Sequence, residues 1–180
     1  SWFNLVFALA HEFGHAIDPC ELRVAHQSIP AYDRLTGCFL ETKVVAMRRT
    51  RSECGDNDQL SEAFADHDRI DVVVSNAGFG AFGAAEDLSD EQVEAAIATN
   101  LTGSIQLARR AVPHLREQGG GVLVQLSSMG GHITFPGFAI YHATKWGIEG
   151  YFETLAQEVA PFGIHTMLVE PGMVRTTFYD

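Results

Sequence analysis

Three short apolar runs alternate with two long segments of helical periodicity in this chain, and this alternation constrains the fold more than any other feature. Residues 72–75, 122–126 and 165–170 are the predicted strands. The first is rich in β-branched valines, which is typical of a strand buried on both faces. Residues 89–118 and 139–159 are the predicted helices. Strands that alternate with helices favour a parallel sheet with right-handed crossovers, so we predict an α/β fold with a partial doubly wound, Rossmann-like sheet.

The first long helix has recognisable ends. Ser89 is a suitable N-cap, and Glu91 and Gln92 follow in the first turn. Three consecutive glycines at 119–121 end it. Its apolar residues recur at helical spacing: Val93, Ala96, Ile97, Leu101, Ile105, Ala108 and Val112.

Tyr141 and Lys145 are four positions apart, so on a helix they share one face. A lysine beside a tyrosine favours the phenolate and lowers the phenol's pKa from its usual value near 10. A tyrosine tuned in this way can exchange a proton with an alcohol or a carbonyl near neutral pH. Ser128 follows the strand at 122–126, which places its hydroxyl at the carboxyl end of a strand, where open α/β sheets bind their ligands.

Residues from about 68 to 180 resemble the short-chain dehydrogenase/reductase family. Five stretches carry the resemblance, in the family's order and at its intervals: residues 75–78 (SNAG), 99–103 (TNLTG), 126–128 (LSS), the Tyr141/Lys145 pair, and 170–176 (EPGMVRT). The resemblance implies an oxidoreductase that transfers hydride between NAD or NADP and a small-molecule carbonyl or alcohol.

The roles of individual residues follow from the same resemblance. Tyr141 is the expected general acid/base, and Lys145 is expected to lower its pKa and to hold the nicotinamide ribose. Ser128 is expected to orient the substrate carbonyl, and Asn100 to anchor a water of the proton relay. The expected cofactor contacts are Asn76, Ala77 and Gly78 on the adenine side, and Pro171, Gly172, Val174 and Thr176 at the nicotinamide end.

The first third of the chain does not continue this resemblance. A Gly-rich turn normally lets the backbone approach the cofactor's pyrophosphate at a helix N-terminus. No Thr-Gly-x-x-x-Gly-x-Gly run precedes Asp71, where the glycines Gly14, Gly37 and Gly55 are isolated. We therefore expect the binding of NAD or NADP to be weak or lost.

Residues 11–15 instead spell H-E-x-x-H within an apolar run. On a helix, His11 and His15 face one side and can share a Zn²⁺, with Glu12 as the general base for a bound water. Glu62 is a candidate third ligand, and Asp66, four residues later, can accept a hydrogen bond from a ligand histidine. These motifs resemble the gluzincin, neprilysin-like zinc metallopeptidases, which implies the same roles. The alternative is an ordinary buried helix with two hydrogen-bonded histidines.

The chain therefore divides into a metallopeptidase-like segment, residues 1–66, and a dehydrogenase-like segment, residues 67–180. We expect helices at 2–17 and 58–66, with loops over 18–56 and an uncertain segment near 39–47. Three functions remain open: the oxidoreductase, a zinc metallopeptidase-like site, and an inactive chimera or truncated fragment. In the last case the strand at 72–74 would present an uncovered edge, which invites pairing with other chains.

The composition of the chain limits the kinds of partner that it can bind. The net charge of −11 argues against binding to nucleic acid or to an anionic membrane. The apolar run at residues 2–10 is too short to span a bilayer, and no basic region precedes it, so we expect a cytoplasmic protein. The three cysteines cannot all pair within one chain. A homo-oligomer formed through the long helices is also expected.

Overall fold

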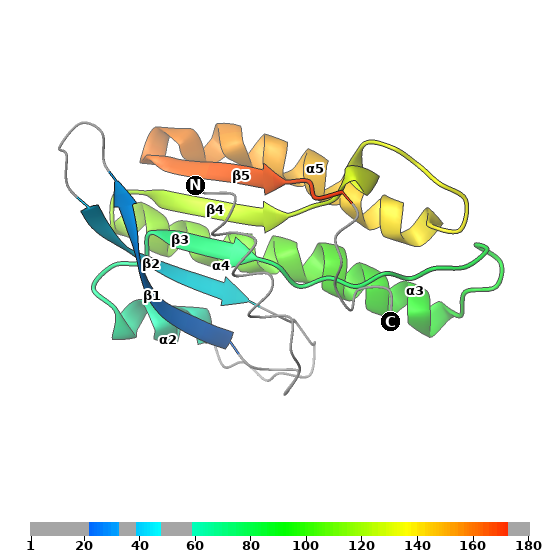
Figure 1. Cartoon of the computed structure of the whole chain (residues 1–180), viewed down its shortest axis with the longest axis horizontal. Helices are drawn as coiled ribbons and strands as arrows, with labels where there is room; N and C mark the ends of the chain where they lie inside the picture. Colours follow the sequence, from blue (N-terminus) through cyan, green and yellow to red (C-terminus); the bar gives the residue numbers. More distant parts are fainter. Residues whose placement is uncertain (1–21, 33–38, 48–58, 173–180) are drawn as a thin grey trace.

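The computed structural model describes residues 22–32, 39–47 and 59–172. Its centre is a five-stranded sheet in the order β1-β2-β3-β4-β5 (Figure 1). β1 and β2 are antiparallel, whereas β2, β3, β4 and β5 are parallel to one another. The strands are β1 (Leu22–Tyr32), β2 (Phe39–Met47), β3 (Val72–Ser75), β4 (Gly121–Leu126) and β5 (Ile164–Val169).

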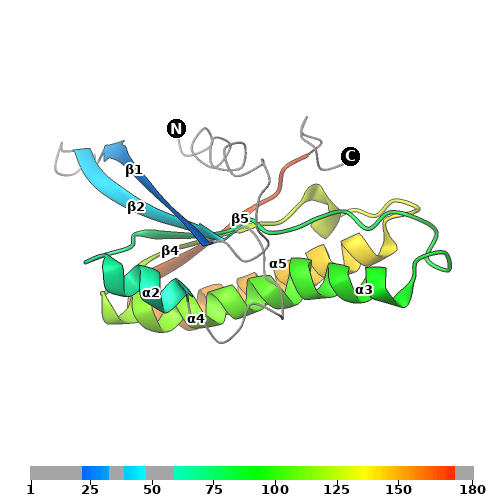
Figure 2. The ribbon, with the colours of Figure 1, turned by 90° about the horizontal axis from the view of Figure 1, so that it is seen from below.

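The helices of the described residues lie on one face of this sheet (Figure 2). They are α2 (Gln59–Asp66), α3 (Asp90–Ile97), α4 (Ser104–Glu117) and α5 (Ala139–Val159). Three short segments complete the described part: the π-helical turn η1 (Ala98–Gly103) and the 3₁₀ turns η2 (Met129–Gly131) and η3 (Ala160–Phe162). None of the described helices is long and apolar enough to cross a membrane.

The hydrophobic core lies between the sheet and the helices. Val73, Leu123 and Ile164 contribute one residue from each of three parallel strands, and each is almost fully buried. From the helices, Leu115 and Phe152 meet them at 0% and 1% exposure. Burial of side chains of this size is worth about 1.5–3 kcal/mol each, so this contact is the main force that fixes α4 and α5 on the sheet.

The prediction of parallel α/β order is confirmed, and three predicted strands and the helix α5 appear at or within one residue of the expected bounds. Two expectations about the first part of the chain are wrong. Residues 18–56, expected to be rich in loops with an uncertain segment near 39–47, contain the strands β1 and β2, and β2 is that segment. The edge of β3 is not uncovered, because Val44 to Met47 of β2 pair with it along its whole length. The predicted helix at 2–17 lies outside the described residues.

The long predicted helix is one helical stretch with a π turn inside it. Ser89 caps α3 as predicted: its hydroxyl accepts from Gln92 N at 3.3 Å, and Gln92 Oε1 accepts from Ser89 N at 2.9 Å. η1 then separates α3 from α4. Single-turn π segments within α-helices occur frequently at functional sites, and this one carries Asn100.

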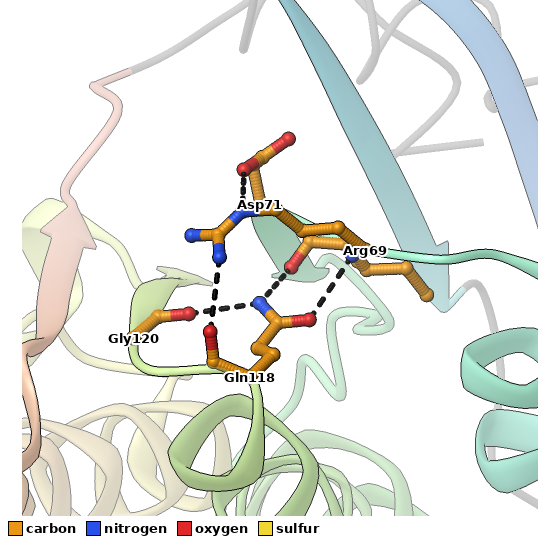
Figure 3. Close-up of polar contacts among 5 residues, drawn as sticks. Arg69, Asp71, Gln118 and Gly120 are labelled. Atoms are coloured by element: carbon orange, nitrogen blue, oxygen red, sulfur yellow. Dashed lines mark hydrogen bonds and ion pairs between the residues drawn. The ribbon is translucent and has the colours of Figure 1, made fainter.

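The other end of α4 is fastened to the start of β3 by the side chain of Gln118 (Figure 3). Its amide accepts from Ile70 N at 3.2 Å and donates to Ile70 O at 2.6 Å and to Gly120 O at 2.8 Å. Arg69 Nη1 donates to Gln118 O at 3.1 Å, and the Arg69 guanidinium also pairs with Asp71 at 2.6 Å. These contacts satisfy backbone groups that a helix end and a strand start would otherwise leave unpaired.

Candidate active site

The residues predicted from the dehydrogenase resemblance gather at the carboxyl edge of the parallel strands. Asn76, Ala77 and Gly78 follow β3, Ser128 follows β4, and Pro171 and Gly172 come shortly after β5. Tyr141 and Lys145 lie in the first two turns of α5. This end of α5 lies beside the same edge of the sheet (Figure 1). Ligands of open α/β sheets bind at this edge.

Asn100 is fully buried in η1 and holds two other segments of the site together. Its side-chain oxygen accepts from Phe79 N at 3.0 Å, and its amide nitrogen donates to Phe79 O at 2.9 Å. The same nitrogen reaches Thr144 Oγ1 at 3.4 Å, next to Lys145 in the chain. Asn100 therefore ties the loop after β3 to α5.

Lys145 is 4% exposed, and its ammonium donates to Leu126 O at 2.9 Å. A methyl group on Gly78 would lie 3.4 Å from Asn100 Oδ1 and 3.7 Å from Lys145 Nζ, so these two groups adjoin the same glycine. Burial lowers the pKa of Lys145 from 10.5 to about 8, and the charge of Glu149 opposes this shift. The lysine therefore loses its proton much closer to neutral pH than an exposed lysine does.

Tyr141 is 7% exposed, and Lys145 Nζ lies 5.7 Å from the centre of its ring. Residues 127–131, which we call the serine turn, reach the other side of the site. Within it, Ser128 Oγ accepts from Gly130 N at 3.1 Å. A methyl group on Gly130 would lie 2.8 Å from His142 Cδ2 and 3.3 Å from Tyr141 Cε1, so the turn packs directly against the tyrosine.

Aromatic side chains surround the tyrosine. The Phe82 ring lies 6.1 Å from that of Tyr141 and 4.6 Å from that of Phe138, and the Phe138 ring stacks on His142 at 5.5 Å. Phe82 and Phe135 are 37% and 46% exposed. Large apolar side chains that remain exposed next to a polar site are typical of a surface that binds an apolar ligand group.

The other predicted residues either lie outside the described part of the chain or lie away from this arrangement. Val174 and Thr176 lie outside the described residues, as do His11, Glu12 and His15. Glu62 is exposed on α2. The helix α2 lies at the opposite end of the sheet from the first turns of α5 (Figure 1). Within the part of the chain that the structure describes, neither Glu62 nor Asp66 belongs to a group of three histidine, cysteine or acidic side chains close enough to hold a metal ion.

The sequence interpretation missed several residues that support the site. Thr144 Oγ1 donates to Tyr141 O at 2.7 Å and accepts from Asn100. Glu149 is buried and bonded to Ser127. The spacing of Glu149, four residues after Lys145, was a signal that could have pointed to it, because such residues share a helix face.

Comparison with known proteins agrees with this geometry. A family model described as short chain dehydrogenase matches residues 41–180. Oxidoreductase BOA17 of Botryotinia fuckeliana is 41% identical over 125 residues, which cover 67% of this chain and 46% of that protein. Human 17-beta-hydroxysteroid dehydrogenase type 1 is 32% identical over 141 residues, which cover 78% of this chain and 42% of that protein.

Solved structures give the same result. A short-chain dehydrogenase from Streptomyces avermitilis superposes with a TM-score of 0.62 at 41% identity, over 65% of this chain and 43% of that one. A structure described as ElxO with NADP bound superposes with a TM-score of 0.64 at 28% identity, over 67% of this chain and 49% of that one. The chain therefore belongs to the short-chain dehydrogenase family.

The chain spans about half the length of the curated relatives it matches. The comparisons give no support to the resemblance to zinc metallopeptidases. The matched range begins at residue 41, so it includes Glu62 and Asp66, which the metallopeptidase interpretation had assigned to a zinc site.

Proposed function

We propose that this protein is an NAD(P)-dependent oxidoreductase that reduces a carbonyl or oxidises an alcohol, with Tyr141 as the general acid/base. The observation that supports this most directly is the buried pair of Tyr141 and Lys145 at the carboxyl edge of the sheet, with the ammonium 5.7 Å from the centre of the phenol ring. A cation held this close in a buried site stabilises the negative charge that develops on the phenol oxygen as its proton leaves.

The residues at this edge fit a nicotinamide cofactor. Gly78 leaves room beside Asn100 and Lys145 that a side chain would occupy. We propose that Asn76, Ala77 and Gly78 contact the adenine side and that Lys145, Pro171 and Gly172 contact the nicotinamide side, joined by Val174 and Thr176. The cofactor, when bound, supplies or accepts the hydride.

The side chains of the protein handle the proton. In the reductive direction, Ser128 donates a hydrogen bond to the substrate carbonyl, and the Tyr141 hydroxyl gives its proton to the same oxygen. Lys145 stabilises the phenolate that remains. Asn100 holds the loop after β3 against α5, and thereby fixes the distance between the two sides of the site. The exposed rings of Phe82 and Phe135 favour a substrate with an apolar body.

The test is carbonyl reduction by wild type and a Tyr141→Phe variant, followed by the loss of NADPH absorbance over a panel of apolar ketones and aldehydes. General acid–base catalysis is worth about 10²–10⁴-fold, so the variant should lose at least about 100-fold in kcat/KM. Tyr151→Phe is the matched control, because it removes the same hydroxyl from α5 away from the site and should retain activity. Equal activity of the Tyr141→Phe variant and wild type would contradict the proposal, and so would inactive wild type.

A further inference from the structure

The carboxylate of Glu149 is a buried charged group that the proposed mechanism does not use. Glu149 is 6% exposed and lies one helical turn after Lys145 on α5, so the two side chains share a helix face. Ser127 Oγ donates a hydrogen bond to Glu149 Oε1. A buried carboxylate is costly unless it is hydrogen-bonded or paired with a cation. The hydrogen bond from Ser127 and the nearby ammonium of Lys145 therefore both offset the cost of burying Glu149.

The serine turn lies directly on this carboxylate. A methyl group on Gly131 would come within 2.8 Å of Glu149 Cγ and 2.9 Å of Glu149 Oε1, so a side chain at this position would displace one of them. The backbone of the turn is held from the other side by the end of β5. Ser127 N donates to Val169 O at 2.8 Å, and Met129 N donates to Pro171 O at 3.3 Å. The conformation around Ser128 therefore depends on β5 and on Glu149.

A histidine connects the same carboxylate to the surface. His132 Nε2 lies 3.0 Å from Glu170 Oε1 and 3.9 Å from Glu149 Oε2. Hydrogen bonding to Glu170 raises the pKa of His132, and the charges of Glu149 and Glu153 act in the same direction. Among the described residues, the charged groups that face Glu149 are Lys145 on its own helix and His132 at the end of the serine turn, with Glu170 behind the histidine.

We propose that Glu149 is a positioning residue for the reaction proposed above: its carboxylate fixes the serine turn beside Tyr141 and places a negative charge one helical turn from Lys145. The relevance of Glu149 to catalysis rests on the proposed function. Its effects on the serine turn and on Lys145 do not depend on that function. Burial alone lowers the pKa of Lys145, and Glu149 is the charge that opposes the shift. Without that charge, Lys145 loses its proton at a lower pH.

The chain holds only two lysines, Lys43 and Lys145, so their titration can be followed directly. The protein is labelled with ¹³Cε-lysine, the two signals are assigned with a Lys43→Arg variant, and each is titrated by NMR. In Glu149→Gln, which keeps an oxygen that accepts from Ser127, the pKa of Lys145 should fall below its wild-type value, because the charge that opposes the effect of burial is gone. Exchange of the Gly130 and Gly131 amides with deuterium should stay as slow as in wild type.

Glu149→Ala removes both the charge and the acceptor for Ser127. It should lower the pKa of Lys145 and also speed amide exchange in the serine turn at least about 10-fold. Glu153→Gln is the matched control, because it removes an exposed charge one turn further along α5 and should change neither readout. Where Glu149→Ala does not fold, Glu149→Gln alone decides.

An unchanged Lys145 pKa in Glu149→Gln would overturn the proposal, and unchanged exchange in a folded Glu149→Ala would overturn its part on the turn. Neither measurement uses a substrate or a cofactor. A failure of the proposed function, seen as inactive wild-type protein, is therefore distinguishable from a failure of this inference.

Discussion

Lys145, a buried residue of the candidate active site, makes the stability of the protein depend on pH. Its pKa falls from 10.5 to about 8 because burial disfavours the ammonium. Between these two values the unfolded chain binds a proton that the folded chain has released. The free energy of unfolding therefore rises with pH across this window, by an amount on the order of 3 kcal/mol from this group alone.

A Lys145→Met variant tests this coupling. The variant lacks the titrating group, so it should not share the gain in stability that wild type makes as the pH rises from about 8 to 10.5. Urea unfolding of both proteins at pH values through this window should show wild type gaining on the order of 3 kcal/mol relative to the variant. Parallel stability curves would mean that the ammonium of Lys145 is solvated in the folded protein.

At this scale the sequence identified the chemistry of the side chains better than their contacts. The spacing of Tyr141 and Lys145 was enough to predict a shared face and a shared site, because a helix has a fixed period. The contacts of Asn100 with Phe79 could not be predicted from the sequence. They depend on the loop after β3 returning to η1 across 21 positions of sequence, and no local pattern encodes such a return.

At the scale of elements, α5 carries two glycines with opposite surroundings. A methyl group on Gly150 would meet no atom within 4 Å, whereas one on Gly147 would lie 3.0 Å from Leu101 Cδ1. Glycine in a helix costs about 0.5–1 kcal/mol relative to alanine, because the unfolded chain loses more freedom on folding. Replacement of glycine by alanine should therefore raise the stability of the protein only at Gly150, where the methyl group has room.

We expect Gly150→Ala to raise the free energy of unfolding by about 0.5–1 kcal/mol. We expect Gly147→Ala to give no gain or a loss, because Leu101 in η1 must shift to admit the methyl group. Chemical denaturation of the two variants beside wild type measures both effects, and each variant is the other's control. An equal gain in both would show that α5 is not held close to η1.

The elements also show where sequence patterns lose their power. The residues of β3 and α5 were predicted at their observed bounds, because a continuous valine run and a long helical period are strong local signals. β1 was missed because its sequence, LRVAHQSIPAY, mixes polar residues with a proline and has no clean alternation. Proline is tolerated on an edge strand, which is where β1 lies.

At the scale of the whole molecule, the arrangement of strands bears on cofactor binding. Residues 78–83 spell G-x-G-x-x-G directly after β3, which is the sequence pattern of a dinucleotide-binding turn. The pattern works only where a helix begins at the turn, because the helix N-terminus binds the pyrophosphate. Here the next helix, α3, begins at Asp90, and Ser89 already caps it. This stretch therefore lacks the geometry of a phosphate site.

The net charge of the chain also argues for weak binding of the cofactor. With a formal charge of −11, the chain repels a polyanionic cofactor unless a local group offsets the charge. We therefore expect the 180-residue chain to bind NADPH with a dissociation constant on the order of 0.1–1 mM, which corresponds to roughly 4–5.5 kcal/mol of binding free energy. Isothermal titration calorimetry measures this constant directly. Raising the salt concentration should screen the repulsion between the acidic chain and the anionic cofactor.

A Lys145→Met variant separates the two ends of the cofactor in the same experiment. If the nicotinamide side supplies most of the remaining contact, loss of the ammonium should weaken the binding of NADPH by about a further 10-fold, which is about 1.4 kcal/mol. Affinity in the micromolar range for wild type would instead mean that residues outside the described part of the chain bind the phosphates. The tight binding would then persist in the Lys145→Met variant, because its largest contribution would come from the pyrophosphate and not from the edge of the sheet that carries Tyr141.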